Sequence, residues 1–156
     1  MDGYEAVEVV GVRVEMPSNA PIVLVRPISG GVLVPIWIGP NEAAAIAMAQ
    51  QGLEAPRPLT HDLFIATLLE LEAPLRSVRI THLDEGVFYA ELDFDSGKVD
   101  ARPSDAIALA LRASVPILVA DEVLSEAGVA PEPADEADEV EQFREFLDTV
   151  TPQDFQ

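Results

Sequence analysis

The sequence of 156 residues contains no cysteine, a single lysine and a single tryptophan. The absence of cysteine excludes a disulfide scaffold, a thiolate zinc site and a cysteine nucleophile. No stretch provides the run of about 20 apolar residues that a membrane-spanning helix needs, and the N-terminus lacks the basic segment of a signal peptide. We therefore expect a soluble, cytoplasmic protein without a membrane partner.

Positive charge is also scarce. The chain has 28 acidic and 9 basic side chains, which give a formal net charge of −19. Residues 121–156 account for −11 of this charge and residues 1–120 for −8. Nonspecific adhesion to nucleic acid depends on many lysines and arginines that neutralise phosphates. The composition therefore excludes a protein that coats DNA or RNA, but it leaves room for a small local phosphate site.

The chain divides into a body, residues 1–129, and a tail, residues 130–156. The length and the 49% content of hydrophobic residues are typical of one globular domain. The tail begins with an acidic, proline-containing linker, and apolar residues then recur at helical spacing between Val140 and Val150. We expect a C-terminal amphipathic helix that docks on the body or on a neighbouring subunit; a partner-binding peptide is the alternative. Either arrangement fits a homo-oligomer, with a dimer favoured.

Periodicity and turn signals predict an α+β fold with a largely antiparallel sheet. Residues 39–47 and 102–110 resemble each other, since each stretch combines a proline, a capping residue, an acid and alternating alanines. Each also follows three predicted strands, so we expect two β-β-β-α halves joined by a middle helix. The predicted strands are 7–15, 21–26, 32–38, 77–82, 87–94, 98–102 and 116–120; the predicted helices are 42–51, 60–72, 104–113 and 121–128, with Asn41, Thr60 and Ser104 as the expected caps of the first three.

One candidate cluster lies at the start of the middle helix, in the stretch Arg57-Pro-Leu-Thr-His-Asp62. Helix N-termini attract anions, and an adjacent His61 and Asp62 can bind a metal ion or move a proton. Arg57 can neutralise a phosphate. The alternative is structural: Asp62 compensates the helix dipole and His61 is exposed and idle.

The second cluster is Asp100-Ala-Arg102-Pro-Ser104-Asp105. Asp100 and Arg102 are two residues apart on a predicted strand and so share a face. Beside a helix N-terminus they can hold a phosphate or, with Asp105, a divalent cation. The structural alternative is a buried Asp–Arg bridge that fixes the corner between strand and helix. Glu42 is the equivalent acid of the first half.

Four stretches carry a resemblance to a known family: 37–43 (WIGPNEA), 57–63 (RPLTHDL), 87–90 (VFYA) and 100–110 (DARPSDAIALA). In order and spacing, they make residues 5–128 similar to the bifunctional nuclease domain family of bacteria and plants. The resemblance implies hydrolysis of phosphodiester bonds in DNA or RNA.

Two functional hypotheses follow. In the first, the protein is a phosphodiesterase assisted by Mg²⁺ or Mn²⁺, with ligands among Asp62, Asp100, Asp105 and Glu42. His61 then acts as acid or base, and arginines and Ser104 hold the phosphate. In the second, the protein is a non-catalytic homo-oligomeric binding or regulatory module, and the same clusters are structural or form a pocket for a small anion.

Overall fold

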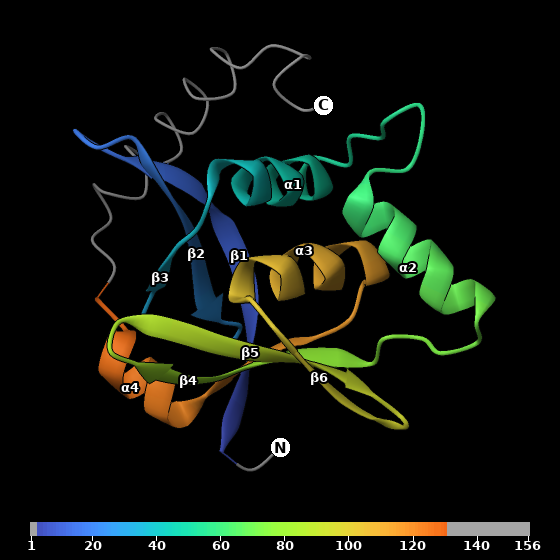
Figure 1. The fold of residues 1–156 in the computed structure, drawn as a ribbon. Helices are drawn as coiled ribbons and strands as arrows, with labels where there is room; N and C mark the ends of the chain where they lie inside the picture. Colours follow the sequence, from blue (N-terminus) through green and yellow to red (C-terminus); the bar gives the residue numbers. More distant parts are fainter. Residues whose placement is uncertain (1–2, 131–156) are drawn as a thin grey trace.

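The computed structural model describes residues 3–130, which form one seven-stranded sheet and four helices (Figure 1). Helices α1, α2 and α3 lie together on one side of the sheet, and α4 lies apart from them beside β4. The elements in chain order are β1 (Tyr4–Glu15), β2 (Ala20–Pro27), β3 (Val34–Trp37), α1 (Pro40–Gln50), α2 (Thr60–Glu70), β4 (Ser77–Asp84), β5 (Val87–Phe94), β6 (Gly97–Ala101), α3 (Pro103–Ala113), β7 (Ile117–Ala120) and α4 (Asp121–Ala127).

The sheet order β3-β2-β1-β7-β4-β5-β6 confirms the α+β class and the two halves. Each half contributes three consecutive antiparallel strands, and its third strand forms an edge of the sheet. The late strand β7 joins the halves, because it pairs antiparallel with β1 and parallel with β4. Helices α1 and α3 follow the third strand of their halves and pack against each other. The first turns of these two helices are thereby brought together.

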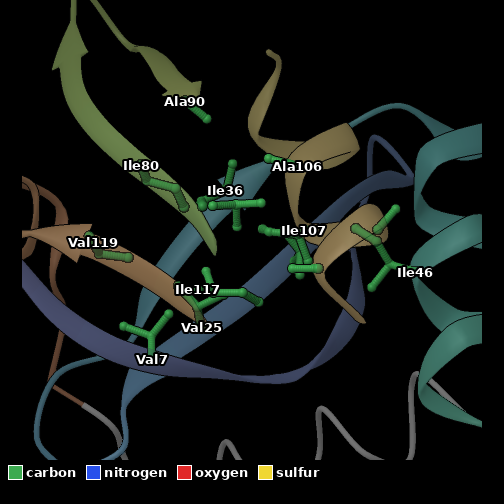
Figure 2. Close-up of a cluster of buried hydrophobic side chains, with 14 of the residues drawn as sticks. Val7, Val25, Ile36, Ile46, Ile80, Ala90, Ala106, Ile107, Ile117 and Val119 are labelled. Atoms are coloured by element: carbon green, nitrogen blue, oxygen red, sulfur yellow. The ribbon is translucent and has the colours of Figure 1, made fainter. Parts of the chain in front are cut away.

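The core lies between the sheet and helices α1 and α3 (Figure 2). Ile46 of α1 and Ile107 of α3 are fully buried against strand residues such as Ile36 and Ile80. The alanines of α1 and α3 face the same core, and their small side chains let the two helices approach the sheet and each other closely. Helix α2 has no fully buried residue and packs mainly on α3. Its position therefore depends on a few specific contacts.

The predicted caps of the three helices are wrong, and for α1 and α3 the reason is the same. Both repeat helices place proline at the first helical position, so α1 is capped by Gly39 and α3 by Arg102 rather than by Asn41 and Ser104. The fixed φ of proline and its missing N–H group suit that position. In α2, Leu59 rather than Thr60 is the cap. Each of the three helices consequently carries its acid in the third helical position.

Within residues 3–130, no helix is long and apolar enough to cross a membrane. The predicted C-terminal helix lies outside the described residues.

Candidate active site

Arg102 links the two halves of the domain. Its Nη1 donates to Glu42 Oε1 at 2.7 Å, and its Nε donates to Asp105 Oδ2 at 2.8 Å. Glu42 and Asp105 occupy equivalent positions in the first turns of α1 and α3, so the internal repeat itself produces the paired carboxylates. The Arg102 side chain is 64% exposed, and its Nη2 makes no hydrogen bond to residues 3–130. One edge of the guanidinium is therefore open to an anion.

The close approach of Glu42 depends on Gly39. A Cβ atom added at Gly39 lies 2.7 Å from Glu42 Oε2, which is closer than real contacts allow. Because Gly39 has no side chain, the Glu42 carboxylate can lie against this helix cap and accept the hydrogen bond from Arg102 there.

His61 completes the cluster from the first turn of α2. Its Nε2 lies 2.9 Å from Asp105 Oδ1, and the ring is largely buried. One carboxylate, Asp105, thus holds both the imidazole and the guanidinium, on its two oxygens. We name these four side chains, Glu42, His61, Arg102 and Asp105, the His–Arg cluster.

The electrostatics of this cluster favour an ionised Asp105. Burial alone raises the pKa of Asp105, but the hydrogen bonds from Arg102 and His61 outweigh that effect, so its pKa lies below the ordinary value. The hydrogen bonds to Asp105 and then to Glu42 raise the pKa of Arg102 further. An ionised carboxylate only accepts hydrogen bonds, so Nε2 of His61 must carry the proton. In the neutral ring, Nδ1 is then the basic nitrogen.

The cluster borders a cleft of about 870 Å³ between α1, α2, α3 and β6. Its walls are mostly apolar, and its polar groups are concentrated around the cluster. Asp100 also lines this cleft, on the edge strand β6. The apolar lining comes mainly from Met48, Leu63, Phe64, Leu92, Val99 and Leu109. A concave, mostly apolar site with a few converging polar groups is typical of ligand-binding sites.

Asp62 does not join the His–Arg cluster, although it follows His61 in the sequence. Its Oδ1 accepts from Arg112 Nε at 2.7 Å, and its Oδ2 accepts from the Leu59 backbone N–H at 3.3 Å. Arg112 also donates to the carbonyl oxygens of Ala108 at 3.0 Å and Ala45 at 3.1 Å. The pair therefore ties α2 to α1 and α3 and holds His61 in place.

The remaining predicted residues lie near the cleft in different settings. Arg57 is exposed on the segment before α2 and does not line the cleft, whereas its neighbour Pro58 does. Ser104 is buried and lines a second hollow rather than the cleft. Asp100 and Arg102 do not form the buried bridge of the structural alternative, because Arg102 bonds to Glu42 and Asp105 and its side chain is exposed.

The carboxylates predicted as metal ligands are mostly engaged by arginines. Within residues 3–130, no group of three or more His, Asp or Glu side chains is arranged so that it could hold a metal ion. The Glu42 and Asp105 carboxylates are bonded to Arg102, and Asp62 is bonded to Arg112. A guanidinium occupies the place between two carboxylates where a cation would otherwise lie.

Two residues of this region were not predicted from the sequence. Arg112 contacts Asp62 from 50 positions further along the chain, and nothing local marks this partner. Trp37 ends β3 and is 59% exposed. The position of the single tryptophan at the end of a predicted strand, just before a Gly-Pro helix start, was a signal that could have been used.

A comparison with known protein families identifies the domain. The sequence model of the bifunctional nuclease domain matches residues 23–132, which is most of the chain. The chain belongs to the bifunctional nuclease domain family. The match includes Glu42, His61, Arg102 and Asp105, so the whole His–Arg cluster lies within the family domain.

The relatives fall into two groups. Proteins of two Mycobacterium tuberculosis strains, both named as uncharacterized, are 54% identical over 96% of this chain and 96% of their own length. Bifunctional nuclease 1 of Oryza sativa subsp. japonica is 27% identical over 87% of this chain, which spans 44% of the rice protein. The bifunctional nuclease of Oryza minuta matches to the same extent. The family resemblance expected from the sequence is thereby confirmed.

Proposed function

We propose that the protein hydrolyses phosphodiester bonds of DNA or RNA at the His–Arg cluster. One observation carries the proposal: within a bifunctional nuclease domain, Asp105 holds an imidazole and an exposed guanidinium side by side at the border of a cleft. These are the groups that proton transfer and phosphate binding need. The names of the rice relatives support the same class of reaction.

In the proposed mechanism, His61 transfers the proton. The ionised Asp105 fixes the Nε2–H tautomer, so Nδ1 takes a proton from the attacking water. The Asp105 carboxylate also stabilises the imidazolium that forms. Protonation of the leaving oxygen by this imidazolium then completes hydrolysis of the P–O bond.

Arg102 binds the phosphate in this mechanism. Its Nη2 makes no hydrogen bond to residues 3–130. A phosphodiester oxygen that accepts from Nη2 gains charge in the transition state, and the guanidinium stabilises that charge. Arg57, exposed at the approach to α2, adds a second positive charge for the flanking phosphate.

A requirement for Mg²⁺ or Mn²⁺ is a further part of the proposal, and the roles of His61 and Arg102 do not depend on it. Asp100 is an exposed carboxylate on the cleft wall. A metal brought in with the substrate phosphates would find an oxygen ligand there. The assay described below separates the two possibilities.

A second candidate function is a non-catalytic, homo-oligomeric binding module with a small-anion pocket. The observation that favours it is that Glu42 and Asp105 already balance the charge of Arg102. The mostly apolar cleft lining suits a small ligand as well as a nucleic acid. A cytoplasmic dimer, as predicted from the sequence, is part of both candidate functions.

The deciding experiment is a nuclease assay on highly purified protein with single-stranded DNA and RNA. His61→Ala and Asp105→Asn should each lower cleavage by about 100-fold or more, which is typical for the loss of a general acid–base group. His82→Ala is the matched control, because His82 is exposed and stacks on Tyr89 instead of facing the cleft. Each variant should first show a wild-type circular dichroism spectrum.

The outcomes separate the hypotheses. Equal cleavage by wild type and the His61 and Asp105 variants would identify a contaminating nuclease and refute the proposal. Cleavage that persists in EDTA but is lost in both variants would support the metal-free mechanism. Loss of cleavage in EDTA, with recovery in Mn²⁺ or Mg²⁺, would establish the metal requirement. No cleavage under any condition would leave the binding module as the function.

A further inference from the structure

A second hollow lies next to the cleft and is lined by aromatic and aliphatic side chains. It has a volume of about 420 Å³ and lies between the end of β3, the turn from β4 to β5 and the start of α3. Trp37, Val87, Phe88 and Pro103 provide its apolar surface. The volume is within the range of pockets that hold small ligands.

The charge of this hollow differs from that of the rest of the chain. Among the described residues that line it, Arg102 is the charged one, and no carboxylate is present. The chain as a whole carries a formal charge of −19. The described lining of the hollow itself therefore places no carboxylate against an anionic ligand.

Arg102 lines both the hollow and the cleft. Arg102 is thus shared by the cleft that contains His61 and the hollow that contains Trp37. The base of a nucleotide is attached a short distance from its phosphate. The position of the hollow therefore corresponds to the position of a base next to the phosphate that Arg102 binds.

Trp37 is the residue in the hollow best suited to a base. Its side chain is 59% exposed, although a tryptophan is ordinarily among the more buried residues. Val87 beside it is also exposed, so the hollow offers apolar surface that nothing in residues 3–130 covers. The flat indole can stack on any base, because every base has a π face.

We propose that this hollow is a subsite for one unpaired nucleobase of the substrate strand, stacked on Trp37 while Arg102 holds the adjoining phosphate. The proposal rests on the nucleic-acid substrate of the proposed function and makes it more specific. In a duplex the bases are paired and stacked on one another, so their faces cannot reach Trp37. The subsite therefore selects single strands over duplexes.

The test uses Trp37 itself as the reporter, because it is the single tryptophan of the chain. A phosphorothioate-linked DNA strand of about twelve nucleotides, within the range that single-strand grooves cover, resists cleavage during the titration. This strand should quench the fluorescence of Trp37 in the wild-type protein. A strand of the same length and linkage without bases, and the corresponding duplex, should quench it much less.

Binding of a fluorescently labelled copy of the strand, followed by anisotropy, measures the energetic contribution of the subsite. Trp37→Ala should weaken binding about tenfold, equivalent to about 1.4 kcal/mol and within the range of one base–aromatic stack. Trp37→Phe should retain most of the affinity. Tyr89→Ala is the matched control, since Tyr89 is an exposed aromatic residue outside the hollow and should leave binding unchanged. In the cleavage assay, Trp37→Ala should raise KM with little change in kcat.

The possible failures are distinguishable. Wild-type affinity in Trp37→Ala, or binding without quenching, would overturn the subsite even if His61-dependent cleavage is present. Quenching and a tenfold loss in Trp37→Ala would support the subsite even if no cleavage is found, and the nuclease proposal alone would fail. A blue shift of Trp37 emission with rising protein concentration, in the absence of nucleic acid, would show that a second copy of the chain covers Trp37 and would also overturn the subsite.

Discussion

Replacement of Arg112 by methionine should destabilise the protein by about 2–3 kcal/mol. Arg112 is 10% exposed and makes three hydrogen bonds, to Asp62, Ala108 and Ala45. A hydrogen bond to a charged group contributes about 1.5–3 kcal/mol. Asp62 is 42% exposed, so water replaces part of what its carboxylate loses. The Ala45 carbonyl on α1 also loses its hydrogen bond to α3. The expected loss of stability therefore lies in the upper part of the range for one hydrogen bond to a charged group.

The measurement is the free energy of unfolding from urea denaturation, with the melting temperature as a second readout. For a chain of this size, a loss of 2–3 kcal/mol lowers the melting temperature by about 5–10 °C. Arg76→Met is the matched control. Arg76 likewise pairs with an aspartate, Asp95, through two hydrogen bonds of 3.0 and 2.8 Å, but the two side chains are 57% and 73% exposed. This exposed pair should contribute nothing measurable.

The comparison of the two variants tests the reasoning itself. If Arg76→Met and Arg112→Met destabilise the protein equally, burial does not decide the strength of these pairs, and the structural role given to Asp62 is refuted. If Arg112→Met is less stable but keeps full activity, α2 holds His61 without this contact. The Arg112–Asp62 pair then stabilises the fold but does not position His61.

Three further predictions concern the His–Arg cluster. The pKa of Asp105 is lower in the folded protein than its ordinary value of 3.8. The ionised carboxylate therefore stabilises the fold fully at pH values above 3.8, and this contribution is lost as the pH falls through the pKa of the folded state. Urea denaturation between about pH 5 and about pH 3 should therefore show a smaller acid-induced loss for Asp105→Asn than for wild type, and equal losses would contradict the lowered pKa. Glu42→Gln should bind the labelled strand about threefold more tightly, since one of the two carboxylates bonded to Arg102 loses its charge; weaker binding would show that Glu42 orients Arg102 instead. With Arg57 and Arg102 as the two phosphate contacts, a plot of log affinity against log salt should have a slope of about −1.4, and a much steeper slope would require a basic surface beyond them.

The two-half architecture could be predicted from the sequence because its signals are local. Alternating strands, turns with glycine and the repeated proline-acid helix starts each fix short stretches of chain. The same repeat places Glu42 and Asp105 in equivalent positions, and it makes Glu42 a candidate once Asp105 is one. The sequence did not place the caps correctly, because the preference of proline for the first helical position outweighed the capping preference of Asn41 and Ser104.

The contacts of the site could not be predicted, because they depend on how α2 packs on α3. His61 and Asp62 are neighbours in sequence, yet one reaches Asp105 and the other reaches Arg112, two turns further along α3. Sequence spacing gave no reason to separate them. Arg102 likewise lies two residues from Asp100 but bonds to Glu42, 60 positions away. Long-range partners of this kind are decided by the packing of helices.

The acidity of the chain and a nucleic-acid substrate are compatible if the carboxylates hold Arg102 with one edge open to a phosphate. Arg102 is held in place by two carboxylates before any substrate arrives, so it needs no ordering when a phosphate binds. The carboxylates also reduce its attraction for phosphates at a distance, which lowers affinity for any strand that offers phosphate alone. Such a site gains selectivity from what lies beside the phosphate. The uncharged surface around Trp37 supplies that second contact, so the negative charge of the chain favours substrates whose unpaired bases can use it.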